Sequence, residues 1–125
     1  MKKVYTYVIP RSFNKYCIPI AIQSCYLKDY CLRSKLEFSL PITELSTTDV
    51  FVKLKQIIKK NNINVAMTSI FILPINKPKF LNKLLKNTSI KNKFHFFLKN
   101  LILNKKEILD WSSDHRKYSK IIKEF

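Results

Sequence analysis

Arginine, serine and glutamate side chains follow the first two predicted strands of this chain, and these residue types are suited to an anionic ligand. Arg11 and Ser12 follow Pro10, which ends an apolar run over residues 4–9, and Glu44 follows a second run over residues 36–43. A guanidinium clamps phosphate or carboxylate groups, a serine hydroxyl serves as donor or nucleophile, and a glutamate serves as a general base. The alternative is that Arg11 and Glu44 form a structural ion pair and Ser12 only caps the loop.

Three further polar residues are expected near the same place. Asn14 lies in the loop after the first strand, Gln23 lies in the helix that follows, and Ser69 interrupts a third apolar run. In open parallel sheets, ligands bind beyond the carboxyl ends of the strands, so residues that follow different strands can converge on one site. The predicted catalytic residues are Ser12 and Glu44, and the predicted substrate-binding residues are Arg11, Asn14, Gln23 and Ser69.

The histidines, acidic residues and cysteines argue against other kinds of site. His95 is predicted inside a strand, where a histidine is usually semi-buried with its hydrogen bonds satisfied. His115 lies on the apolar stripe of the last helix. Neither histidine is therefore an evident base to activate Ser12. Only eight residues are acidic, which fits neither a two-carboxylate hydrolase nor a carboxylate-rich metal site. The three cysteines form no CxxC pair and are interpreted as free thiols. No metal is expected.

The absence of glycine limits the cofactors that the chain can hold. Gly-rich phosphate loops, the GxGxxG dinucleotide turn and the GxSxG nucleophile elbow all need a residue without a Cβ, and the sequence contains no glycine. We therefore expect no cofactor of these classes. Any phosphate must be held by a helix N-terminus or by side chains such as Arg11.

The formal net charge of +16 would attract nucleic acid, anionic lipid or phosphorylated substrates. However, only Arg11, Arg33 and Arg116 are arginines, and the abundant Lys, Ile, Asn, Phe and Tyr are the residues with A/T-rich codons. A protein that reads bases or clamps phosphate normally keeps more forked guanidinium donors. We therefore place genomic composition bias ahead of nucleic-acid binding as the origin of the charge.

Strand and helix patterns alternate along the 125 residues. Strands are predicted over residues 4–9, 36–43, 63–73 and 93–98, and helices over residues 19–34, 50–60, 78–85 and 104–125. This alternation predicts right-handed crossovers and a mostly parallel sheet with helices on both faces. The expected fold is a single three-layer α/β domain with a four-stranded, resolvase-like or flavodoxin-like sheet over residues 1–103 and a C-terminal amphipathic helix over residues 104–125.

The last predicted helix carries apolar residues at alternating three- and four-residue spacing from Ile108 to Phe125. Packing against the domain core ranks first, a homodimer seam second and a membrane-surface helix third. No apolar run approaches the ~20 residues of a transmembrane helix, and residues 4–9 are too short for a secretion signal. The expected location is the cytoplasm.

Several of these segments together resemble the sporadic carbohydrate cluster protein family. The matching segments are residues 7–14 (YVIPRSFN), Gln23, residues 29–31 (DYC), residues 43–44 (TE) and residues 69–74 (SIFILP). They follow the family's order over roughly the first hundred residues. Thr68 and Ile72 depart from the family pattern, which usually has Tyr and Gln at these positions. The family consists of small proteins of unknown activity encoded among genes for surface-carbohydrate synthesis, so the resemblance implies a pathway and no reaction.

A more distant similarity is to the catalytic domain of serine recombinases, which also begins with a strand leading to Arg and Ser. That motif places one residue between the arginine and the serine, whereas Arg11 and Ser12 are adjacent, so only the fold is carried over. The leading hypothesis is a cytoplasmic accessory protein or small enzyme of surface-carbohydrate biosynthesis that binds a nucleotide sugar or sugar phosphate. The alternatives are a nucleic-acid-binding module derived from a recombinase-like domain and a non-catalytic dimeric scaffold or regulator.

Overall fold

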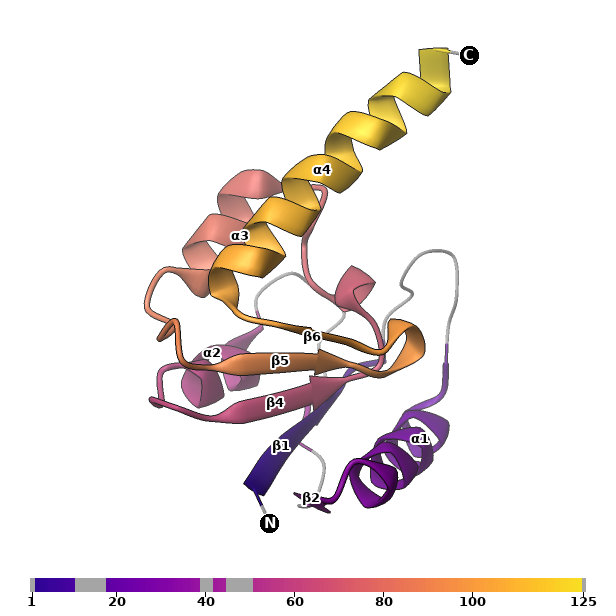
Figure 1. Cartoon of the computed structure of the whole chain (residues 1–125), viewed down its shortest axis with the longest axis vertical. Helices are drawn as coiled ribbons and strands as arrows, with labels where there is room; N and C mark the ends of the chain where they lie inside the picture. Colours follow the sequence, from indigo (N-terminus) through magenta and orange to yellow (C-terminus); the bar gives the residue numbers. More distant parts are fainter. Residues whose placement is uncertain (1, 11–17, 39–41, 45–50, 125) are drawn as a thin grey trace.

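The computed structural model describes residues 2–10, 18–38, 42–44 and 51–124, and within them it shows a mixed α/β fold (Figure 1). The elements in chain order are β1 (Lys2–Val8), α1 (Ile20–Arg33), β2 (Leu36–Phe38), β3 (Ile42–Thr43), α2 (Val52–Ile58), β4 (Asn64–Met67), the 3₁₀ turn η1 (Ile70–Ile72), α3 (Pro78–Leu85), β5 (Lys93–Phe96), the 3₁₀ turn η2 (Phe97–Lys99), β6 (Leu101–Leu103) and α4 (Lys105–Glu124). The predicted alternation of strands and helices is confirmed for this part of the chain.

The sheet has the strand order β2-β1-β4-β5-β6, and β3 also pairs with β1. The pairs from β2 to β5 are parallel, and the final pair, β5 with β6, is antiparallel. β1 and β4 therefore lie in the middle of the sheet. Such central strands are covered on both faces, which is why their sequences are apolar with little alternation.

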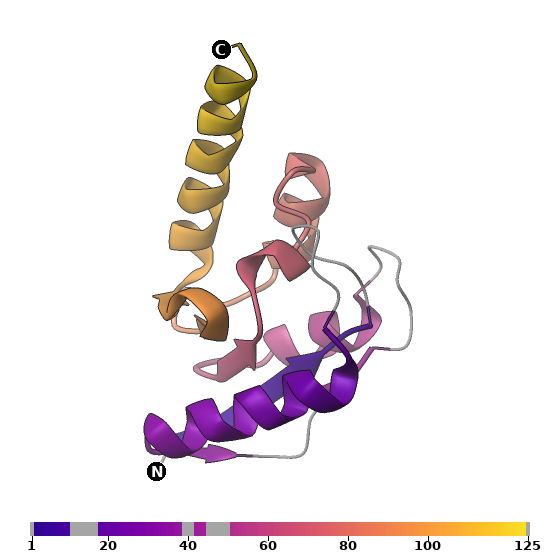
Figure 2. The ribbon, with the colours of Figure 1, turned by 90° about the vertical axis from the view of Figure 1, so that its right-hand side faces the viewer.

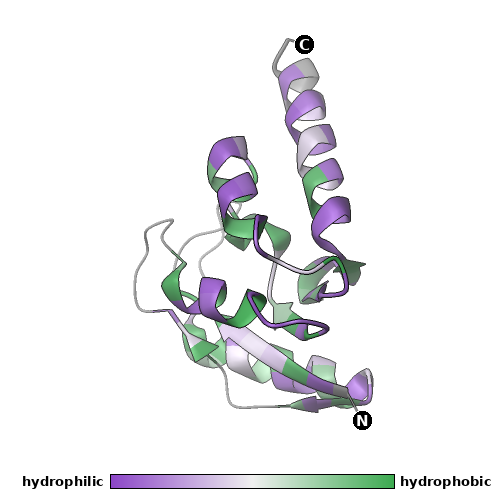
Figure 3. Ribbon diagram, turned by 90° about the vertical axis from the view of Figure 1, so that its left-hand side faces the viewer, coloured by the Kyte–Doolittle hydropathy of each residue, from purple (hydrophilic) through white to green (hydrophobic). Residues whose placement is uncertain are grey.

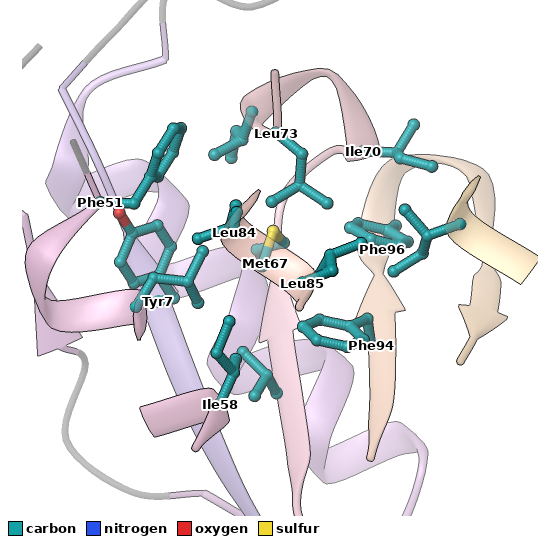
Figure 4. Packing of buried hydrophobic residues seen from close by; sticks show 14 of the residues in the cluster. Tyr7, Phe51, Ile58, Met67, Ile70, Leu73, Leu84, Leu85, Phe94 and Phe96 are labelled. Carbon is teal, nitrogen blue, oxygen red and sulfur yellow. The ribbon is translucent and has the colours of Figure 1, made fainter. Parts of the chain in front are cut away.

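Helices cover both faces of the sheet, and the alternation of side chains along β1 divides the core in two. Val4 and Val8 point toward α1 and pack with Leu27 and Cys31. Tyr7 and its neighbours on the other face pack against α2, α3 and the start of α4. Figure 4 shows this larger cluster, and Figure 2 shows α1 and α4 on opposite sides of the sheet.

Two of the strand predictions were incomplete. The run over residues 63–73 is a strand only as far as Met67, because the Ser69 hydroxyl accepts a hydrogen bond from the Phe71 N–H and caps η1. Such a local side-chain bond offers the backbone an alternative to the strand ladder. The run over residues 36–43 forms two short strands, β2 and β3. The short antiparallel strand β6 was not expected.

The last helix packs on the domain from Ile108 to Arg116. Ile108 is fully buried, Trp111 contacts Phe71 edge to face, and the Arg116 guanidinium donates to the carbonyl of Ile75 at 2.6 Å. Farther along, Tyr118 is 66 % exposed. Figure 1 shows α4 extending away from the sheet, and Figure 3 colours the helix mostly as hydrophilic. Core packing is confirmed for this part of the helix, and dimerisation remains a prediction. In the described part of the chain, no helix is long and apolar enough to cross a membrane.

Candidate functional site

Three of the six predicted site residues, Gln23, Glu44 and Ser69, lie at one edge of the sheet, where the central strands end. Glu44 follows β3, Thr68 and Ser69 follow β4, and Gln23 lies in the first turn of α1. Glu44 and Gln23 are both tied to the end of β1, since the Glu44 N–H donates to the Val8 carbonyl and the Gln23 amide donates to the Ile9 carbonyl. The expected convergence at the carboxyl edge is therefore observed for these residues.

Gln23 is the residue that joins three segments at this edge. Its side-chain nitrogen donates to the carbonyl of Ile9 at 3.0 Å and to the carbonyl of Ile18 at 2.7 Å. Its side-chain oxygen accepts from the Thr68 hydroxyl at 3.4 Å. Gln23 and Thr68 are both fully buried. Because the amide uses both hydrogens and its oxygen, it fixes the two ends of the segment that connects β1 to α1 and links them to β4.

Glu44 holds the N-terminus of α2. Its Oε1 atom accepts hydrogen bonds from the backbone N–H groups of Lys53, at 2.7 Å, and Leu54, at 3.4 Å. These first-turn N–H groups have no partner within the helix, and a carboxylate is favoured at the positive end of the helix dipole. Glu44 is only 5 % exposed. The carboxylate predicted as a catalytic base is thus also a buried cap that connects β3 to α2.

The Ser69 hydroxyl is bonded within its own turn. Its Oγ accepts from the Phe71 N–H at 3.2 Å, and the residue is 6 % exposed. A hydroxyl has a donor as well as acceptor lone pairs, so this bond leaves the Ser69 proton available to a ligand or to another acceptor. The adjacent Thr68 directs its own proton to Gln23. The two hydroxyls at the carboxyl end of β4 therefore differ in their bonds: the Thr68 hydroxyl donates to Gln23, and the Ser69 hydroxyl accepts from Phe71.

Arg11, Ser12 and Asn14 lie outside the described residues, so the predicted ion pair between Arg11 and Glu44 is not tested. Pro10, the last described residue before them, is partly buried at the end of β1. The chain thus enters residues 11–17 at this edge and returns from them at Ile18, which is bonded to Gln23. The predicted capping pair Ser46 and Asp49 likewise lies outside the described residues.

Both histidines are packed in the way that their sequence positions predict. The His115 ring stacks on Trp111 with ring centroids 5.2 Å apart. His95 is 6 % exposed, and its two ring nitrogens face Tyr30 and Asn64 at hydrogen-bond distance. These two partners could not be predicted from the sequence, because they come from distant elements. Among the described residues, no group of histidine, cysteine and acidic side chains could hold a metal ion.

Two buried groups on the α1 side of the sheet have raised pKa values. Burial raises the pKa of the Tyr30 hydroxyl, an effect that a hydrogen bond with Ser34 partly offsets. Burial also raises the pKa of the Cys31 thiol. Both groups are therefore neutral at pH 7. Cys25, by contrast, is exposed.

The chain matches no known protein family, no curated protein and no solved structure. The resemblance to the sporadic carbohydrate cluster protein family therefore stays a prediction from the sequence.

Proposed function

We propose that this protein is an accessory protein or small enzyme of surface-carbohydrate biosynthesis, and that it binds an anionic sugar intermediate at the carboxyl edge of β1 and β4. The sugar intermediate is a nucleotide sugar or a sugar phosphate. The observation that carries the proposal is the convergence of Gln23, Glu44, Thr68 and Ser69 at this edge. The pathway comes from the family resemblance.

The topology supports a ligand site between β1 and β4. The chain that leaves β1 continues to α1 on one face of the sheet, and the chain that leaves β4 continues to α3 on the other. In doubly wound sheets the crevice where connections diverge in this way is the usual ligand site. Counting the parallel strands alone, with β3 left aside, the order is 2-1-3-4, and this order supports the proposed flavodoxin-like arrangement.

The chemistry of the edge supports an anionic ligand. Arg11 follows Pro10 directly, so the guanidinium belongs to the segment whose two ends Gln23 fixes. The hydroxyl of Ser69 and those of the sugar can exchange hydrogen bonds, and the guanidinium supplies the charge that a phosphate requires. With no glycine in the chain, side chains such as these are the means of holding a phosphate.

Thermal unfolding in the presence of nucleotide sugars, sugar phosphates and short DNA tests the proposal. A sugar ligand at a hundred times its dissociation constant should stabilise the protein by ~2.7 kcal/mol and raise the melting temperature. Arg11→Ala should abolish this shift. Arg33→Ala is the matched control, because Arg33 is exposed at the far end of α1 and pairs there with Asp29, so the shift should persist.

The same experiment separates the sugar ligand from nucleic acid. Binding of DNA by surface lysines falls steeply with salt concentration, whereas a pocket with few ionic contacts tolerates moderate salt. A stabilisation by DNA alone that is lost in salt and unchanged in Arg11→Ala would contradict the sugar proposal. It would support a nucleic-acid-binding module instead.

A further inference from the structure

Exposed lysines gather where the parallel strands begin, at the edge of the sheet opposite to the candidate site. In the register of the sheet, Val4 lies beside Asn64 and Asn64 beside Lys93, so the amino ends of β1, β4 and β5 are level with one another. The turn after α3 leads into the same edge. We name this place the amino-edge surface and define it by the exposed residues Lys3, Lys60, Lys86, Ile90, Lys91 and Lys93.

Asn92 fixes the two turns that carry most of these residues to each other. Its side-chain nitrogen donates to the carbonyls of Ile58, at 3.1 Å, and Lys60, at 2.8 Å. Its side-chain oxygen accepts from the Ile63 N–H at 3.0 Å. Asn92 is fully buried and directly precedes β5, whereas residues 59–63 connect α2 to β4. Figure 1 shows both turns side by side at the left of the sheet, so the surface around them is preorganised.

Ile90 is an apolar residue at the tip of the turn before β5. The Asn92 N–H donates to the Ser89 carbonyl at 3.1 Å, which closes a four-residue turn with Ile90 in its second position. The Ser89 hydroxyl accepts from the Lys91 N–H at 3.2 Å within the same turn. Glycine, proline, asparagine, aspartate and serine dominate turns, yet here an isoleucine is 55 % exposed. The closed turn thus presents an apolar side chain with a lysine beside it.

The potential at the amino-edge surface is positive. The Lys60 ammonium donates to the Tyr5 hydroxyl at 3.2 Å, and the Lys60 and Lys3 ammonium groups lie 4.8 and 5.4 Å from the centre of the Tyr5 ring. The hydrogen bond from Lys60 lowers the pKa of the Tyr5 hydroxyl, and the charges of both lysines act in the same direction. Among the described residues, the carboxylates at this edge are Glu37 of β2 and Glu107 at the start of α4. The lysines outnumber them, which favours an anionic partner.

We propose that the amino-edge surface binds an anionic lipid membrane, with Ile90 entering the interfacial region of the bilayer. Each lysine held near such a membrane raises the partition constant about fivefold. An exposed aliphatic side chain gains further by leaving water for lipid. Nucleic acid shares the electrostatic attraction, but single strands are held by open aromatic rings, and the Tyr5 ring has ammonium groups over it. The membrane therefore explains both the lysines and Ile90.

The orientation that this surface imposes leaves the candidate sugar site free. The amino-edge surface and the carboxyl edge are at opposite ends of β1 and β4, so a membrane at one edge does not cover the other. Both sites can be occupied at the same time. The membrane proposal thus does not depend on the proposed sugar ligand.

Co-sedimentation with lipid vesicles tests the proposal. We expect the protein to bind vesicles of phosphatidylcholine mixed with phosphatidylserine and not vesicles of phosphatidylcholine alone, with binding that weakens as the salt concentration rises. Equal binding to the two kinds of vesicle, or binding to neither, would overturn the proposal. Binding to a short DNA duplex without binding to the mixed vesicles would identify a nucleic-acid surface instead.

A pair of isoleucine variants tests the role of the turn tip. Ile90→Ala should weaken binding to the mixed vesicles about tenfold, because the side chain that enters the lipid is shortened. Ile22→Ala is the matched control, since Ile22 is 44 % exposed in the first turn of α1, at the other edge of the sheet, and its binding should be unchanged. An equal effect of the two variants would contradict the insertion of Ile90.

A pair of lysine variants on α3 tests the orientation. Lys86→Gln, directly after the helix, should weaken binding about fivefold. Lys79→Gln makes the same charge change in the first turn, about 12 Å away along the eight-residue helix, which exceeds the Debye length of about 8 Å, and should have little effect. Equal losses would show binding without a preferred face and would overturn the proposal. Arg11→Ala should leave vesicle binding unchanged, so failure here is distinct from failure of the sugar site.

Discussion

Replacement of Gln23 by leucine is expected to lower the free energy of unfolding by about 2–4 kcal/mol. The variant keeps the size of the side chain but removes its hydrogen-bonding atoms, which leaves the carbonyls of Ile9 and Ile18 and the hydroxyl of Thr68 without this partner. Buried polar groups that lose a partner incur their desolvation cost. Urea unfolding of the two proteins measures the difference. The same variant should also lose the stabilisation by sugar ligands, because Gln23 fixes both ends of the segment that contains Arg11.

Thr68→Val is the matched control for this prediction. It removes only the 3.4 Å contact with the Gln23 oxygen and keeps the β-branched shape, so it should cost about 1 kcal/mol or less. If Gln23→Leu were no more destabilising than Thr68→Val, the bonds to the two carbonyls would not hold this edge together. The structural role assigned to Gln23 would then be wrong.

Phe94→Ala is expected to have the largest effect on stability, a loss of about 3–5 kcal/mol. Phe94 is fully buried in β5 and belongs to the larger cluster, to which α2, α3 and α4 contribute (Figure 4). Truncation of the ring removes apolar contacts and leaves a cavity beneath three helices. Chemical denaturation measures the loss, and a thermal scan should show a correspondingly lower melting temperature.

Ile90→Ala provides the comparison on an exposed side chain close to the same strand. Ile90 is 55 % exposed in the turn before β5, so its truncation should change the stability by no more than about 0.5 kcal/mol. A similar loss in Ile90→Ala and Phe94→Ala would contradict the placement of the core on this face of the sheet.

Much of the fold followed from the sequence because the elements carry strong local patterns. α3 begins at Pro78, as expected of a residue suited to the first helical turn, and Leu81, Leu84 and Leu85 of its predicted stripe are buried. Phe80 of that stripe is 53 % exposed instead. The three residues of β6 are too short to show a period, and the strand exists only because it pairs with β5.

The position of the candidate site in the fold could be predicted from the sequence. The hydrogen-bond partners of its residues could not. The rule that residues after parallel strands converge located Glu44, Gln23 and Ser69 at one edge. It did not anticipate that Glu44 caps α2, because that contact depends on where β3 lies beside β1. The contact between Tyr30 and His95 spans 65 positions in the chain and depends on packing between α1 and β5. The spacing of neighbouring residues in the sequence does not predict a contact between positions so far apart.

The most direct test of the proposed function is backbone amide NMR during titration with the nucleotide sugar or sugar phosphate that stabilises the protein most. The account predicts that the largest chemical-shift changes occur at Gln23, Glu44, Thr68 and Ser69, with little change at Lys93 and His95 on the opposite edge. Changes spread over exposed lysines, or confined to the amino ends of β4 and β5, would contradict a sugar site at the carboxyl edge of β1 and β4.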